Sequence, residues 1–129
     1  MDQYLKVENA VSRLVKEYEE HGSLVVAYDF DNTVYDYHQA GHTYADVIAL
    51  LKDMKTIGCY LIIFTANEDY DFIKKYCSEN EIPYDTINEN PPFFDSPARK
   101  IYYNILLDDR AGLKQAYDSL KELLKRLKK

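Results

Sequence analysis

The chain has 129 residues, which is enough for one hydrophobic core and too few for two domains. Its net charge of −6 disfavours general nucleic-acid binding, which needs a basic face, but leaves open a nucleotide or strand end held by a few cationic groups. No apolar stretch approaches about 18 residues and no signal-peptide pattern is present, so we expect one cytoplasmic domain over residues 1–129 without membrane contact.

The amino-terminal part of the chain predicts a helix followed by a buried strand. Apolar residues recur at helical spacing over residues 3–20, and Gly22 ends this pattern. Residues 24–29 predict a buried strand, because an apolar, partly β-branched run ends there on Asp29. A polar loop rich in tyrosine and histidine follows over residues 32–42.

The middle of the chain repeats this alternation. Thr43 and Asp46 have the spacing of a capping box and predict the start of a second helix, which ends at Gly58. Residues 60–64 predict a second buried strand. Asn67 is predicted to cap the helix that follows it.

The remaining elements continue the pattern to the carboxyl end. The third helix is predicted to run to about residue 79, and residues 84–87 predict a short third strand. A loop with three prolines over residues 88–98 precedes a fourth strand at residues 103–107. The last predicted helix covers residues 113–127, and its basic end is interpreted as a solvated terminus.

Strands that alternate with helices of this length predict the α/β class, with a three-layer, Rossmann-like fold, a mostly parallel sheet and helices on both faces. Right-handed connections bring the carboxyl ends of such strands to one edge of the sheet, where open α/β sheets bind their ligands. The polar residues that follow the predicted strands at this edge are Asp29, Asp31, Thr65, Asp108 and Asp109.

Asp29 and Asp31 stand two positions apart at the end of the first predicted strand, so their carboxylates point to the same side. Carboxylates this close repel each other unless a cation or a proton lies between them. Such a pair alone also suits a simple turn, with Asp29 as a cap and Asn32 at positive φ. The further carboxylates at this edge favour a metal site, and oxygen ligands without His or Cys select Mg²⁺.

The same residue types support phosphoryl chemistry. A carboxylate can attack phosphorus and form an aspartyl-phosphate. A second carboxyl group can protonate the leaving alkoxide and then activate water. A hydroxyl group and a lysine can hold the phosphoryl oxygens and balance their charge.

Four short motifs occur in order over residues 24–112: Asp-Phe-Asp-Asn-Thr-Val at 29–34, Phe-Thr at 64–65, Lys100, and Leu-Leu-Asp-Asp at 106–109. In this order they resemble the four motifs of the haloacid dehalogenase (HAD) superfamily. The connections between them are short, so the chain looks like a small, phosphatase-like member without a cap domain and with an open site.

This resemblance implies a role for each motif residue. Asp29 is the expected nucleophile, Asp31 the general acid and base, and Thr65 a hydrogen-bond donor to the phosphoryl group. Lys100 is expected to pair with Asp29 and the phosphoryl group. The alternative cations are Lys74, Lys75 and Arg99.

The implied cofactor is Mg²⁺, held by Asp108 and Asp109 together with Asp29 and the backbone carbonyl of Asp31. Which of Asp108 and Asp109 is the main ligand stays open. Asp31 also distinguishes the subclasses, because family dehalogenases lack a second aspartate and pump-type ATPases carry threonine there. The resemblance therefore implies a Mg²⁺-dependent phosphomonoester hydrolase that acts through an aspartyl-phosphate on Asp29.

The substrate is a phosphorylated small molecule, nucleotide or macromolecular end, and the sequence does not distinguish these classes. Aromatic residues in the loops either stack on a base or sugar or pack against a second copy of the chain, so a homo-oligomer is left open. The polar candidates for substrate contact are Asn32, His38, His42, Asn67 and Asn88.

Two other functions fit the same motifs. A phosphotransferase or phosphomutase usually needs a cap that excludes water, and no cap is expected here. A non-catalytic module that binds a phosphate ligand would have lost turnover, whereas every expected catalytic residue is present. Hydrolysis is therefore the preferred hypothesis.

Overall fold

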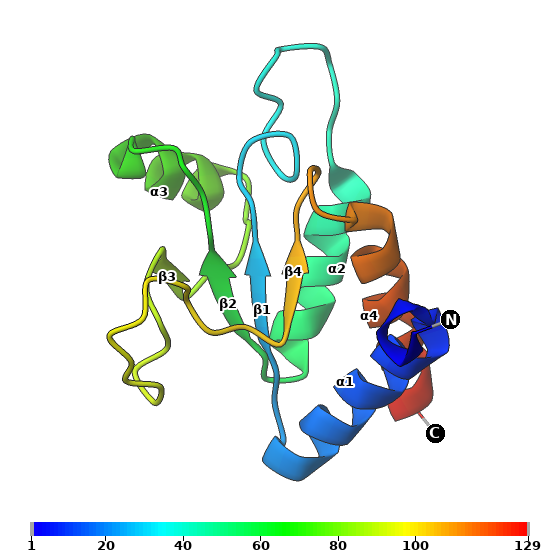
Figure 1. The fold of residues 1–129 in the computed structure, drawn as a ribbon. Helices are drawn as coiled ribbons and strands as arrows, with labels where there is room; N and C mark the ends of the chain where they lie inside the picture. Colours follow the sequence, from blue (N-terminus) through cyan, green and yellow to red (C-terminus); the bar gives the residue numbers. More distant parts are fainter. Residues whose placement is uncertain (1, 129) are drawn as a thin grey trace.

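Four parallel strands form the centre of the fold in a computed structural model, which describes residues 2–128 (Figure 1). Met1 and Lys129, the two ends of the predicted domain, lie outside the described residues. The strand order is β3-β2-β1-β4, so β1 is paired on both sides. The strands are β1 (Val25–Tyr28), β2 (Tyr60–Ile63), β3 (Thr86–Ile87) and β4 (Ile105–Leu107).

Helices connect these strands and cover the sheet. A short 3₁₀ turn η1 (Gln3–Leu5) precedes α1, because Lys6 is extended and interrupts the predicted amino-terminal helix. Gly22, at φ 72°, ends α1 in the left-handed region that glycine adopts without strain. The helices are α1 (Val7–His21), α2 (Ala45–Thr56), α3 (Tyr70–Glu79) and α4 (Leu113–Leu127).

The two faces of β1 pack into different hydrophobic clusters. Val26 and Tyr28 point into the larger cluster, which contains buried residues from all four α-helices. Val25 and Ala27 point to the other face and pack with Ile101 in a smaller cluster that contains no α-helix residue. This alternation is the period-two pattern of a strand that is buried on both faces.

The predicted α/β class, with a parallel sheet flanked by helices, is confirmed. One detail of the layers differs from the expectation of helices on both faces. The connection between β3 and β4 (residues 88–104) covers the second face without forming a helix. Its prolines, Pro91, Pro92 and Pro97, lack a backbone N–H and disfavour helical geometry, which accounts for the extended course.

Two predicted helix caps are wrong. The capping box of Thr43 and Asp46 does not form, because Tyr44 occupies the N-cap position of α2 in the left-handed region and no side chain caps it. Asn67 does not cap α3; Asp69 does, and its carboxylate accepts a 3.1 Å hydrogen bond from the Phe72 N–H. Both errors are local, and the helices themselves form where the apolar spacing predicts them.

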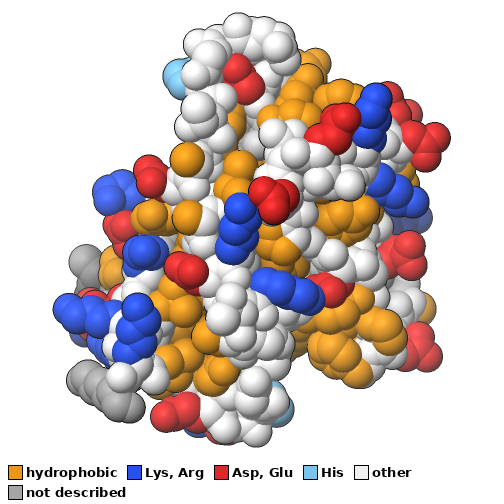
Figure 2. Space-filling view, turned by 180° about the vertical axis from the view of Figure 1, so that it is seen from behind, with side chains coloured by type: hydrophobic (Ala, Val, Ile, Leu, Met, Phe, Trp, Pro, Cys, Tyr) orange, Lys and Arg blue, Asp and Glu red, His pale blue; other side chains and the backbone are white. Residues whose placement is uncertain are grey.

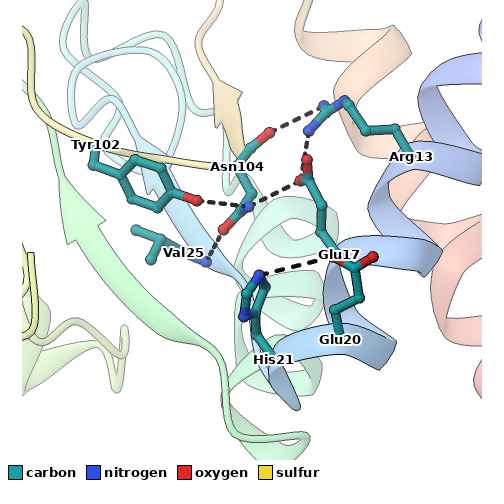
Figure 3. Close-up of polar contacts among 7 residues, drawn as sticks. All are labelled: Arg13, Glu17, Glu20, His21, Val25, Tyr102 and Asn104. Atoms are coloured by element: carbon teal, nitrogen blue, oxygen red, sulfur yellow. Dashed lines mark hydrogen bonds and ion pairs between the residues drawn. The ribbon is translucent and has the colours of Figure 1, made fainter.

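A polar network around Asn104 holds β1, β4 and α1 together at the amino ends of the strands (Figure 3). The Asn104 Oδ1 atom accepts a 2.6 Å bond from the Val25 N–H, and its Nδ2 group donates to Glu17 at 2.9 Å. Arg13 donates to the Asn104 carbonyl at 3.1 Å and pairs with Glu17 at 2.7 Å. The network fixes how β4 lies beside β1, and therefore which residues meet at their carboxyl ends.

Figure 2 shows the molecule from behind, where basic and acidic side chains are mixed between hydrophobic ones. Ion pairs between residues four apart occur on the helices, such as Lys114 with Asp118 at 2.8 Å. Within residues 2–128 we find no helix that is both long enough and apolar enough to cross a membrane. Cys59 and Cys77 are buried and form no disulfide.

Candidate active site

The carboxyl ends of β1, β2 and β4 form a cleft of about 830 Å³. Main-chain pairing continues past β1 and β2, since the Asp29 N–H bonds to the Leu107 carbonyl at 2.9 Å and the Phe64 N–H to the Tyr28 carbonyl at 2.8 Å. The loops after β1 and β4 lie at the same end of the sheet (Figure 1). The lining residues are Asp29, Asp31, Asn32, Tyr37, His38, Phe64, Thr65, Ala66, Asn67, Asp108, Asp109 and Arg110.

Three carboxylates meet at the centre of this cleft. One oxygen from each of Asp29, Asp108 and Asp109 lies within 4.8 Å of the other two. The Phe30 N–H donates a 2.8 Å hydrogen bond to Asp29 Oδ1 and so orients this carboxylate. The ligand set contains only hard oxygen atoms, which Mg²⁺ prefers, and lacks the His and Cys ligands that are typical of zinc and copper sites.

The environment of Asp29 favours its protonated form when no cation is present. Burial is the largest cause, and the neighbouring charges of Asp108 and Asp109 act in the same direction, against the Phe30 hydrogen bond. Together they raise the pKa of Asp29 from 3.8 to about 6. A bound divalent cation would remove this repulsion, because it favours the ionised form of every carboxylate around it.

Asp31 begins a tight turn beside the three carboxylates. Its Oδ1 atom is buried and has no hydrogen-bond partner among the described residues. Burial raises the pKa of Asp31, the amide of Asn67 lowers it, and the charge of Asp109 raises it again. In the turn, the Phe30 carbonyl accepts N–H bonds from Val34 at 3.1 Å and from Tyr35 at 3.0 Å. A carboxyl group with a raised pKa and an unpaired oxygen is suited to carry a proton.

Thr33 is a site residue to which the sequence analysis gave no role. Its side chain is fully buried, and its Oγ1 atom accepts a 3.3 Å bond from the Asp109 N–H. The hydroxyl also lies 3.5 Å from Asp109 Oδ1, to which it donates. Thr33 therefore joins the turn after β1 to the acidic pair after β4. In the sequence, its position within the first motif was the feature that could have indicated a role at the site.

Thr65 is held in place by Asn88. The Asn88 side chain accepts from the Thr65 N–H and donates to the Thr65 carbonyl, both at 2.8 Å, and also donates to the Tyr70 hydroxyl at 2.7 Å. The Thr65 Oγ1 atom accepts a 3.1 Å bond from the Asn67 N–H, and Thr65 faces the cleft. Asn88, an expected substrate contact, is absent from the cleft lining, and its side chain holds the Thr65 backbone in place.

The structure brings most, but not all, of the predicted polar contacts to the cleft. Asn32, His38 and Asn67 line it as expected. His42 does not, because the backbone around it folds back onto Asp36. The Asp36 carboxylate accepts N–H bonds from Ala40, Gly41 and His42, at 3.2, 2.7 and 3.2 Å, and braces the loop that carries Tyr37 and His38.

The basic residues differ most from the expectation in where their side chains lie. Lys100 is exposed and outside the cleft lining, and its Nζ atom lies 5.6 Å from the ring centroid of Tyr103. The alternatives Lys74, Lys75 and Arg99 do not line the cleft either. Arg110, which the sequence analysis did not single out, does. The available signal was its position directly after the fourth motif.

Comparison with known proteins supports the fold and leaves the chemistry open. No protein-family model matches the chain, and no curated protein matches it. A solved structure of a conserved protein from Bacteroides thetaiotaomicron is similar, with 22% sequence identity and a TM-score of 0.65 over 83% of this chain and 93% of that one. At this identity the similarity concerns the fold alone.

Proposed function

We propose that the chain is a Mg²⁺-dependent phosphomonoester hydrolase of the HAD type, with Asp29 as the nucleophile. The observation that carries this proposal is the meeting of the Asp29, Asp108 and Asp109 carboxylates within 4.8 Å at the carboxyl ends of β1 and β4. Thr65, at the end of the neighbouring β2, offers a hydroxyl group to a phosphoryl oxygen. The order of the four motifs along the chain supports the same reaction.

In the first step, a carboxylate oxygen of Asp29 attacks phosphorus, and the bond between phosphorus and the ester oxygen breaks. The proton on Asp31 passes to the leaving alkoxide, so the products are a free alcohol and an aspartyl-phosphate on Asp29. Burial shifts the pKa of Asp31 upward, which is the direction that a proton donor needs. The Phe30 N–H holds Asp29 in one orientation throughout.

In the second step, Asp31, now ionised, takes a proton from a water molecule whose oxygen attacks the same phosphorus. The acyl-phosphate bond breaks, inorganic phosphate leaves, and Asp29 returns to its carboxylate form. Mg²⁺, held by Asp29, Asp108, Asp109 and the Asp31 carbonyl, would supply positive charge that offsets the carboxylates and the phosphoryl oxygens.

The open cleft favours hydrolysis over transfer to a second substrate. Asp109, His38 and Arg110 are exposed at its rim, so water has access to the aspartyl-phosphate. The buried, unpaired Cys59 and Cys77 agree with a reducing compartment, and we place the enzyme in the cytoplasm on that basis.

Hydrolysis of an aryl phosphate, with and without Mg²⁺, tests this proposal. The wild type, Asp29→Asn and the matched surface variant Asp118→Asn are compared. We expect Mg²⁺-dependent release in the wild type and in Asp118→Asn, and none in Asp29→Asn. Unchanged release by Asp29→Asn would refute the proposal. Tight Mg²⁺-dependent binding of phosphate esters without turnover, across a broad panel, would favour the non-catalytic binding module instead.

A further inference from the structure

Arg110 is the one lysine or arginine that lines the cleft within the described residues 2–128. It follows the acidic pair in a tight turn, in which its own N–H donates to Asp108 Oδ1 at 2.8 Å. The Ala111 N–H closes the turn on the Asp108 carbonyl at 2.9 Å. The main chain of Arg110 is therefore fixed relative to the carboxylates, while its side chain is exposed at the cleft.

The guanidinium group of Arg110 forms no ion pair or hydrogen bond with any described residue. Two other arginines do pair with acids on their own helices, Arg13 with Glu17 at 2.7 Å and Arg126 with Glu122 at 3.5 Å. Arg110 lies next to two carboxylates in the chain and pairs with neither. Its five N–H donors are thus available to a ligand in the cleft.

The charge of the cleft requires such a donor. Four carboxyl groups line it, those of Asp29, Asp31, Asp108 and Asp109. With Asp31 protonated for the first step, three negative charges remain, and one divalent cation offsets two of them. A phosphate monoester approaches as an anion and is repelled by what remains. Thr65 can donate one neutral hydrogen bond from the β2 side. Arg110 lies on the opposite side of Asp29, after β4.

We propose that Arg110 binds the phosphoryl group of the substrate, opposite Thr65 and with Asp29 between them. The planar guanidinium group can donate two parallel N–H bonds to two phosphoryl oxygens, which a lysine cannot do. This inference rests on the proposed function, because it names the residue that recognises the phosphoryl group in that same site. It also replaces Lys100 with Arg110 in the role of the phosphate cation.

Calorimetric titration of inorganic phosphate at saturating Mg²⁺ tests the inference. Arg110→Ala, Arg110→Lys and Arg99→Ala are compared with the wild type, and Arg99 is a matched arginine that is exposed outside the cleft. We expect Arg110→Ala to weaken phosphate binding about tenfold or more, Arg110→Lys to restore it in part, and Arg99→Ala to stay within about twofold. Mg²⁺ affinity should not fall in Arg110→Ala, because the N–H that Asp108 accepts belongs to the main chain.

The outcomes separate the two proposals. A loss of less than about threefold in Arg110→Ala, in a protein whose wild type binds phosphate and hydrolyses the aryl ester, overturns the role of Arg110 and leaves the hydrolase intact. A larger loss supports that role, provided that the melting temperature and Mg²⁺ affinity are retained. A wild type that neither binds phosphate in the presence of Mg²⁺ nor hydrolyses esters overturns both proposals together.

Discussion

Thr33 and Asp109 are separated by 76 positions in the chain, yet the Asp109 N–H donates a 3.3 Å hydrogen bond to the buried Thr33 hydroxyl. This contact ties the turn that contains Asp31 to the loop that contains the acidic pair. It therefore helps to fix the positions of the carboxylates after β1 and β4 relative to each other. We expect the affinity for Mg²⁺ to depend on these positions.

Removal of the Thr33 hydroxyl should loosen this arrangement. We expect Thr33→Val to destabilise the protein by about 1–2 kcal/mol, because the Asp109 N–H loses its partner. Mg²⁺ affinity should fall about tenfold, while Thr33→Ser should keep most of it. Thr56→Val is the control, since that exposed hydroxyl bonds only within α2. Equal Mg²⁺ affinity in Thr33→Val and the wild type would show that the contact does not shape the site.

Bound Mg²⁺ should stabilise the folded protein by mass action. At a Mg²⁺ concentration about 100 times the dissociation constant, the expected gain is about 2.7 kcal/mol, seen as a rise in melting temperature. Asp108→Asn and Asp109→Asn should each reduce this rise, and the larger reduction identifies the main ligand. Asp118→Asn, on the surface of α4, should keep the full rise. A rise that survives both cleft substitutions would place the ion elsewhere.

Asp29 should make the metal-free protein pH-sensitive. Folding raises the pKa of Asp29 from 3.8 to about 6, so the folded protein binds this proton more tightly than the unfolded chain does. This contribution to stability is complete below about pH 4 and is lost as the pH rises through about 6. After allowance for solvent screening, the loss at neutral pH is roughly 1–2 kcal/mol.

Asp29→Asn has no such proton to lose. Without metal, we expect this variant to melt above the wild type at about pH 7.5 and close to it at about pH 4. Adding Mg²⁺ should reverse the order at the higher pH, because only the wild type keeps the Asp29 ligand. Melting curves across this range, with EDTA or with Mg²⁺, measure both effects. A variant less stable than the metal-free wild type at pH 7.5 would contradict the electrostatic account.

Asn88 should act on catalysis through Thr65. Asn88→Gly removes the side-chain clamp and keeps the positive φ of 55° that the backbone adopts there. We expect kcat to fall about tenfold and stability to fall by about 1–2 kcal/mol. Glu81→Gly is the control, because Glu81 is exposed and has a similar φ of 54°. If both variants retain wild-type kcat, the clamp does not matter for the reaction.

The family resemblance and the observed geometry give different predictions for Lys100. The resemblance assigns it to the phosphoryl group, whereas its Nζ atom lies over the Tyr103 ring and outside the cleft lining. We expect Lys100→Met to lower kcat/KM by less than about tenfold, because Arg110 supplies the cationic contact. A loss as large as that of Asp29→Asn would return the role to Lys100 and require its side chain to turn into the cleft.

The strands, the helices and the acidic residues could be predicted because each depends on a local pattern. Apolar runs that end on Asp29, Thr65 and Asp108 mark strands and their carboxyl ends, and parallel pairing then brings those ends together. The class of the fold and the composition of the acidic cluster follow from these patterns.

The parts that could not be predicted depend on contacts between distant segments. Asn88 faces Thr65 only because β3 pairs with β2, and the course of the segment that carries Lys100 depends on packing against the second face of the sheet. Spacing along the chain placed Lys100 near its motif partners, but it carries no information about where the side chain points. The sequence position of Arg110 does not show that its side chain lines the cleft, because this depends on how the loop after β4 lies beside the turn after β1.

The central claim is that Asp29 accepts the phosphoryl group, and beryllium fluoride tests it most directly because it mimics an aspartyl-phosphate. Fluorine NMR of the protein with Mg²⁺ and beryllium fluoride should show a bound signal in the wild type. The signal should be absent without Mg²⁺ and absent in Asp29→Asn, while Asp118→Asn should retain it. A bound signal that persists in Asp29→Asn, or no bound signal in the wild type, would contradict the account.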